Sequence, residues 1–203
     1  MSWPHPAYVV RTSRLVFRCY ERADVGAVHA GIVANKQALL PWMSWFSREP
    51  LTLEERVDQL RRFRGAFDRG KDFFYGVFDR ESGAFLGGTG LHPRSGIGVL
   101  EIGYWIVPER WGEGLAYELA SALTRVGFEV MEARRIEIRV APTNTRSLRI
   151  PRKLGYREEG LLRGVGENAD GTFGDLVVFG MLRDELSASP ASTAIVEIER
   201  FSA

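Results

Sequence analysis

Hydrophobic residues recur along the chain with two different periods, and the change between them separates predicted strands from predicted helices. Runs rich in alternating apolar, β-branched and aromatic residues predict strands at residues 14–20, 73–79, 85–91, 99–107, 135–140, from 156 onward and 175–182. Apolar residues at helical spacing predict helices over residues 22–40, 53–69, 112–131 and about 146–154. The order of these elements, an antiparallel meander and then alternating helices and strands, predicts one mixed α/β domain.

The first predicted strand has three alternate residues, Leu15, Phe17 and Cys19, that are expected to face the core. Cys19 is the only cysteine in the chain, which excludes an intrachain disulfide and gives no support to a cysteine-based metal site. We interpret this side chain as a small core residue rather than a reactive thiol.

A cluster of large side chains follows the first predicted helix, at residues 40–46. Pro41 makes a regular helix unfavourable there. Two interpretations are open: the cluster packs beneath a loop, or its aromatic residues, Trp42 and Trp45 among them, line a ligand pocket. After the cluster, Thr52 is predicted to cap the next helix, because threonine is a favoured N-cap residue.

Composition and charge narrow the class of protein. The 203 residues include 27 basic and 26 acidic side chains, so the chain lacks the strong positive charge that is typical of nucleic-acid-binding proteins. No apolar run approaches the roughly 20 residues of a membrane span. The opening residues lack the pattern of a signal peptide, so we expect a cytoplasmic location. We expect one domain over residues 1–186, followed by residues 187–203 as a linker-like tail or an appended edge strand.

The stretch that is most informative for function joins the strand at 99–107 to the helix over 112–131. Gly112 and Gly114 stand between them. Backbone N–H groups at a helix N-terminus attract anions, and glycines let a phosphate group approach closely. Tyr117 stands where the Rossmann fingerprint requires glycine, and the P-loop sequence is absent. The open interpretations are a phosphate site of another kind and a glycine turn without a ligand.

Several motifs along the chain occur in the order and spacing of one protein family. They are Thr12-Ser13-Arg14-Leu15, Leu40-Pro41-Trp42-Met43, Gly87-Gly88-x-Gly90-Leu91, Glu101–Pro108, Trp111–Ala116, Asn144-x-x-Ser147, Leu154-Gly155-Tyr156-x-x-Glu159-Gly160 and Gly171-x-x-x-Asp175. Together they resemble the GNAT acetyltransferases, and more closely the RimJ/RimL-type branch, which acetylates N-terminal amines, notably those of ribosomal proteins. The resemblance covers about residues 10–186 and is far more specific than any one of its motifs.

The resemblance implies a GNAT fold, in which a mixed, mostly antiparallel sheet of about seven strands is flanked by helices and splayed at its central strands. It also implies acetyl-CoA as co-substrate and no metal. The residues implied to bind acetyl-CoA are Ile106 and Val107 on the splayed strand, Trp111, the pyrophosphate cradle of Gly112, Glu113, Gly114, Leu115 and Ala116, and Asn144. For Trp111 a packing role is open, and for Asn144 a role as helix N-cap.

Acetyl transfer requires a base for the amine and a donor for the oxyanion. Alternation places Glu101 on one face of its strand with Trp105, where apolar neighbours would suit a proton acceptor. A structural or acceptor-binding carboxylate is an equal alternative. The backbone N–H near Val107 is the candidate oxyanion donor. Glu167, in a predicted glycine-rich loop over residues 164–174, is the second candidate base by resemblance, and a solvated loop charge is its alternative.

The leaving thiolate raises a separate question. Many GNAT enzymes have a tyrosine as general acid at the position of Pro151, which has no proton to give. In the RimJ/RimL branch the proposed substitute matches Ser147, for which helix capping is the alternative interpretation. Pro151 is also expected to interrupt the short helix.

The implied reaction is direct attack of a primary amine on acetyl-CoA within a ternary complex. The resemblance favours the α-amino group of a protein or peptide as acceptor, and the residues expected to bind it are Trp42, Trp45, His92 and Tyr104. A small-molecule amine is one alternative, because fold does not fix the acceptor. A non-catalytic acyl-CoA-binding module is another, because the usual tyrosine is missing. The resemblance allows a homodimer, and we expect neither a membrane nor a nucleic-acid partner.

Overall fold

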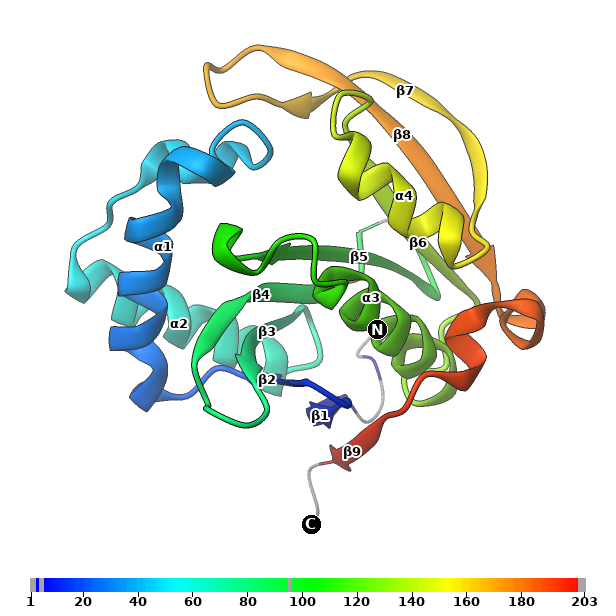
Figure 1. Ribbon diagram of the computed structural model, residues 1–203, viewed down its shortest axis with the longest axis horizontal. Helices are drawn as coiled ribbons and strands as arrows, with labels where there is room; N and C mark the ends of the chain where they lie inside the picture. Colours follow the sequence, from blue (N-terminus) through cyan, green and yellow to red (C-terminus); the bar gives the residue numbers. More distant parts are fainter. Residues whose placement is uncertain (1–2, 4–5, 95, 201–203) are drawn as a thin grey trace.

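The computed structural model describes residues 3, 6–94 and 96–200. A nine-stranded sheet runs through the molecule in the order β7-β8-β6-β5-β4-β3-β2-β1-β9, with helices on both faces (Figure 1). Residues 1, 2, 4 and 5 of the opening segment, on which the expectation about a signal peptide rests, and residues 201–203 of the predicted tail lie outside the described residues. Within the described part of the chain, no helix has the length and apolar character that crossing a membrane requires.

The elements follow the predicted order. The strands are β1 (Ala7–Arg11), β2 (Leu15–Cys19), β3 (Phe73–Asp79), β4 (Phe85–His92), β5 (Val99–Ile106), β6 (Arg135–Val140), β7 (Arg157–Glu167), β8 (Phe173–Leu182) and β9 (Glu197–Arg200). The helices are α1 (Val25–Leu39), α2 (Leu53–Asp68), α3 (Leu115–Glu129) and α4 (Thr145–Lys153), with short 3₁₀ turns between some elements. β1 is not among the predicted strands, and β9 pairs with it at the edge of the sheet.

The centre of the sheet is splayed, as expected. Within the described residues β5 and β6 are the one parallel pair, and their pairing joins Val99–Glu101 to Arg135–Glu137 and stops there. β5 continues to pair with β4 as far as Ile106. Beyond Glu101, one edge of β5 is therefore open.

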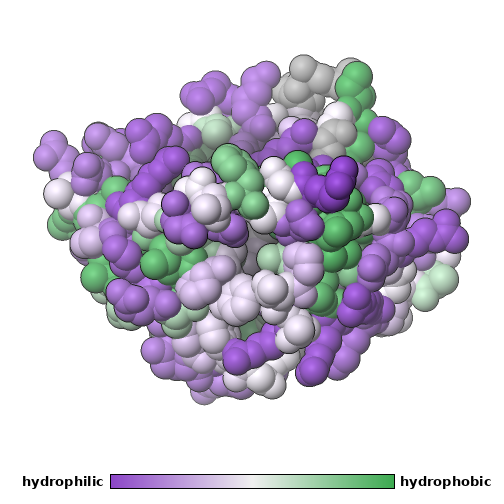
Figure 2. Space-filling view, turned by 90° about the horizontal axis from the view of Figure 1, so that it is seen from above, coloured by the Kyte–Doolittle hydropathy of each residue, from purple (hydrophilic) through white to green (hydrophobic). Residues whose placement is uncertain are grey.

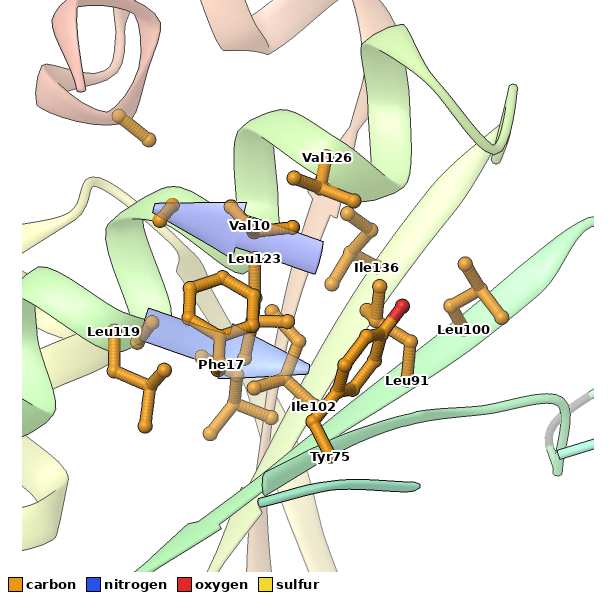
Figure 3. Close-up of a cluster of buried hydrophobic side chains, with 14 of the residues drawn as sticks. Val10, Phe17, Tyr75, Leu91, Leu100, Ile102, Leu119, Leu123, Val126 and Ile136 are labelled. Atoms are coloured by element: carbon orange, nitrogen blue, oxygen red, sulfur yellow. The ribbon is translucent and has the colours of Figure 1, made fainter. Parts of the chain in front are cut away.

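One face of the sheet packs against α3. Leu119, Leu123 and Val126, spaced along one side of that helix, point toward strand residues such as Phe17 and Ile102 (Figure 3). All five side chains are buried. This is the apolar stripe that the helical spacing predicts.

The opposite face is covered by α1 and α2, which form a second apolar cluster. Phe46 is buried in it and packs edge-on against Trp105 of β5, with ring centroids 5.8 Å apart. A Cβ added at Gly88 would lie 2.7 Å from the Trp105 indole nitrogen, so this glycine permits the close approach that its place in a strand predicts. The predicted cap of α2 is confirmed, since the Thr52 hydroxyl accepts a hydrogen bond from the Glu55 N–H.

Residues 164–174, predicted as a loop, are mostly strand. β7 extends to Glu167 and β8 begins at Phe173, so that the two form one long hairpin. Gly164, with a φ of 64°, lies within an irregularity of the pairing. The glycines here produce a bulge instead of ending the strand.

Two expectations about helix boundaries were also wrong. Pro151 does not interrupt the short helix, because α4 continues to Lys153. Proline removes only its own N–H, and less than one turn of helix follows it. The helix predicted over 112–131 begins at Leu115, because Gly114 has a left-handed φ of 80° and is the N-cap.

Candidate active site

A pocket of about 190 Å³ opens where β5 and β6 diverge. Its walls come from β5, from β6 with the start of α4, from the loop after α1, and from the end of the β7–β8 hairpin. In Figure 1 that loop, α4 and the end of that hairpin all lie on the same side of β5. Six of the predicted site residues line the pocket together: Trp42, Glu101, Tyr104, Asn144, Ser147 and Glu167.

The pocket lining carries more acidic than basic side chains. Its ionisable residues of these two kinds are Glu101, Arg139, Glu167 and Asp175. Seen from above, hydrophilic residues dominate this side of the molecule, with hydrophobic residues in separate groups (Figure 2). The lining therefore suits a cationic acceptor better than an anionic one.

Glu101 and Tyr104 reach the pocket from opposite faces of β5, as alternation predicts. Ile102 and Ile106 are buried on the α3 side of the sheet, whereas Trp105 packs on the α1–α2 side. The divergence of β6 is what lets side chains from both faces border one space.

The oxyanion donor is expected near Val107, but the N–H of Val107 itself is already paired. The Val107 N–H donates to the Leu86 carbonyl at 2.8 Å, so it faces β4. Backbone groups of successive residues alternate in direction along an antiparallel pair. The N–H groups of Tyr104 and Ile106 therefore face the open side of β5.

The environment of Glu101 also differs from the prediction. Its carboxylate oxygens lie 4.0 Å from an Arg94 nitrogen and 3.5 Å from an Arg139 nitrogen. Its neighbours are charged rather than apolar. The backbone of Glu101 is held on both sides, because this residue is paired with His92 on β4 and with Glu137 on β6.

Ser147 lies in the first turn of α4 and carries a hydroxyl into the pocket. Its Oγ is 2.9 Å from the Tyr104 hydroxyl. Its N–H donates to the Asn144 side-chain oxygen at 3.1 Å, so Asn144 caps the helix. The Asn144 amide nitrogen has no acceptor among the described residues and is free to donate to a ligand. Burial raises the pKa of Tyr104 to about 12, so its hydroxyl is protonated at neutral pH.

The glycine turn before α3 presents a row of backbone donors. None of the described residues accepts a hydrogen bond from the N–H groups of residues 112–117. Gly112 has a φ of 87°, and a Cβ added there would have no heavy atom within 4 Å. Unpaired amides around an open space fit a pyrophosphate group. The predicted cradle of residues 112–116 therefore has the required donors, and Tyr117 adds one more.

Trp111 joins this turn to the open edge of β5. Its indole nitrogen donates to the Ile106 carbonyl at 2.7 Å. The guanidinium of Arg146, from the first turn of α4, lies 4.9 Å from the centre of the indole ring. Arg146 was not predicted, although its place between Asn144 and Ser147 in one motif was a usable signal.

Arg110 is paired with Glu113 and Asp79, and these hydrogen bonds raise its pKa.

The aromatic cluster after α1 serves both of the roles left open. Trp42 is 42% exposed and lines the pocket, whereas Phe46 is fully buried. Trp45 stacks on Phe46 at a centroid distance of 3.9 Å and is not among the pocket residues. This loop ends in a buried ion pair that sequence reasoning missed, in which Arg56 of α2 donates to Glu49 at 2.6 Å.

One further candidate, His92, lies outside the pocket lining, as does Cys19, which is expected in the core. His92 is buried, with its Nδ1 2.5 Å from a carboxylate oxygen of Asp72, and it adjoins the pocket residues Glu101 and Gly103 without lining the pocket itself. Cys19 is buried in the core, and burial raises its pKa to about 12. Among the described residues, no group of three or more histidine, cysteine, aspartate or glutamate side chains is arranged to hold a metal ion.

Comparison with known proteins identifies the family of this chain. The model of the acetyltransferase (GNAT) domain matches residues 14–157. The chain is 28% identical over 177 residues to the putative ribosomal N-acetyltransferase YdaF of Bacillus subtilis (strain 168), covering 84% of this chain and 92% of that protein. It is 25% identical over 160 residues to the [ribosomal protein uS5]-alanine N-acetyltransferase of Escherichia coli (strain K12), covering 76% of this chain and 81% of that one. The structure of Mycobacterium smegmatis RimJ in complex with CoA-disulfide has the same fold, with a TM-score of 0.78, 24% identity and 95% coverage of both chains.

Proposed function

Since the chain belongs to the GNAT family of acetyl-CoA-dependent N-acetyltransferases, we propose that its acceptor is the α-amino group of a protein or peptide. One observation carries the proposal: an acidic pocket lies at the divergence of β5 and β6, and a row of unpaired amides follows Trp111, whose indole donates to the open edge of β5. The Escherichia coli relative is named as an N-acetyltransferase of an alanine of ribosomal protein uS5, and alanine offers no amine other than its α-amino group, which supports this class of acceptor.

The residues present fit acetyl-CoA, which supplies an activated thioester when bound. The amides of residues 112–117 hold the pyrophosphate, and the Asn144 amide donates to the pantetheine arm. The N–H groups of Tyr104 and Ile106, on the open edge of β5, are placed to stabilise an oxyanion. Glu101 receives the ammonium group and takes its proton.

Release of free CoA thiol, measured with and without amine acceptors, tests the proposal. The acceptors are a set of peptides that differ in their first residue, the same peptides with blocked N-termini, and small polyamines. We expect release with the free peptides alone. Release with polyamines alone would show that the acceptor is a small-molecule amine. CoA binding without any transfer would support a non-catalytic module.

Replacing Gly112 with alanine is expected to weaken CoA binding by roughly tenfold, about 1.4 kcal/mol. An L-residue at a φ of 87° is strained, and its Cβ would project into the open space beside the amides. Calorimetric titration with CoA measures the change. Gly155→Ala is the matched control, because Gly155 has a φ of 81° and an equally open surrounding but lies after α4, away from the turn before α3. Equal CoA affinity of the two variants would contradict the assignment.

A further inference from the structure

The fold contains two pairs of hydroxyl groups that look alike and differ in one respect. Tyr156 lies 2.7 Å from the Thr124 hydroxyl, and Tyr104 lies 2.9 Å from the Ser147 hydroxyl. The Thr124 hydroxyl donates to the Ala120 carbonyl at 2.7 Å, so its only proton is already used. Tyr156 therefore donates to Thr124, and neither hydroxyl has a proton left for another acceptor.

In the Tyr104–Ser147 pair, one hydroxyl proton has no acceptor among the described residues. Among the described residues, Tyr104 is the only hydrogen-bond partner of the Ser147 hydroxyl. Both residues line the pocket. A serine hydroxyl has one proton to donate and can also accept. If Tyr104 donates to Ser147, the serine proton is directed away from the tyrosine and is available to a group in the pocket.

We propose that Tyr104 is a positioning residue that donates to Ser147 and so directs the Ser147 hydroxyl to the sulfur of the leaving thiolate. This inference rests on the proposed function. In acetyl transfer the amine nitrogen forms a bond to the thioester carbonyl carbon, the carbon–sulfur bond breaks, and its electron pair stays on sulfur. The ammonium nitrogen loses one proton to Glu101 before it attacks, and it loses the second to solvent as the tetrahedral intermediate breaks down and CoA leaves as the thiolate. Ser147 keeps its own proton throughout, so its role toward sulfur is that of a hydrogen-bond donor rather than an acid.

The properties of the two residues suit this division of roles. Burial keeps Tyr104 protonated at neutral pH, so it remains a donor while charge develops on sulfur. A hydrogen bond to an ionised group is stronger than one between neutral groups, and a chain of two bonds strengthens each member. Ser147 therefore touches the reacting atoms, and Tyr104 acts through it.

The test titrates the thiol of bound CoA by its ultraviolet absorbance, with the complex of desulfo-CoA as blank. The only cysteine of the chain, Cys19, has a pKa raised to about 12 and contributes no thiolate below pH 9. We expect Ser147→Ala to raise the pKa of the bound thiol by about one unit. Tyr104→Phe should raise it by roughly half as much. The double variant should match Ser147→Ala alone, because Tyr104 has no effect without the serine.

Tyr156→Phe is the matched control, since it also removes a buried phenol hydroxyl from a hydroxyl partner. It should leave the thiol titration and kcat unchanged, whereas Tyr104→Phe should lower kcat about threefold to tenfold with little change in KM for acetyl-CoA. If Tyr104→Phe behaves like Tyr156→Phe, or if the effects of Tyr104→Phe and Ser147→Ala add, the inference is overturned. Failure of the unmodified protein to bind CoA would instead overturn the proposed function.

Discussion

Replacing Glu101 with glutamine is expected to lower kcat/KM for a peptide acceptor by about 10²–10⁴-fold, the usual contribution of a general base. Glutamine keeps the shape of the side chain but cannot take up the ammonium proton. The deficit should shrink as the pH is raised through about 8, because an α-amine is then increasingly unprotonated before it binds. Initial rates of CoA release across this pH range measure both effects.

The neighbouring Glu137 provides the control for this prediction. It is paired with Glu101 across β5 and β6, and it also contacts Arg139, but it is not among the pocket residues. Glu137→Gln should therefore change kcat/KM far less than Glu101→Gln. Glu167→Gln tests the second candidate base. A loss of kcat/KM in Glu167→Gln but not in Glu101→Gln would show that Glu167, at the end of the hairpin, is the base.

Replacing Arg56 with methionine is expected to destabilise the fold by about 3–5 kcal/mol, because it leaves a buried carboxylate without its partner. The Arg56 and Glu49 side chains are 0% and 1% exposed, and their nitrogen and oxygen are 2.6 Å apart. Lys36 also donates to the Glu49 carbonyl, so three elements meet at the end of the loop that carries Trp42. Denaturant unfolding measures the loss.

The double variant Glu49→Leu/Arg56→Met separates the cost of an unpaired charge from the loss of a contact. With both charges removed, much of the stability should return, since apolar residues commonly replace a buried ion pair without net loss. A loss below about 1 kcal/mol in Arg56→Met, the range of an exposed pair, would contradict this account of the loop.

The sequence predicted most of the elements because their signals are local. The Thr52 cap and the apolar stripe of α3 each depend on residues within one helix, and both are confirmed. The end of the β7–β8 hairpin was mistaken for a loop because a glycine-rich composition is shared by loops and bulged strands. β1 was missed, and its pairing with β9 joins segments from the two ends of the chain, which no local pattern reports.

The candidate site divides in the same way. The turn at Gly112 could be predicted because a strand, glycines and a helix follow one another in sequence. The partners of Glu101 could not be predicted, because Arg139 belongs to β6, a different strand. Alternation along β5 alone suggests apolar surroundings instead. The contact of Tyr104 with Ser147 joins residues 43 positions apart and depends on how α4 packs beside β5.

The most direct test of the central claim is the position of the acetyl group on one peptide that has both a free α-amine and an internal lysine. After incubation with the protein and acetyl-CoA, tandem mass spectrometry locates the modification. We predict a single acetyl group on the α-nitrogen, none on the twin peptide with a blocked N-terminus, and strongly reduced product with Glu101→Gln. Acetylation of the lysine, or no peptide product while small amines are acetylated, would contradict the claim.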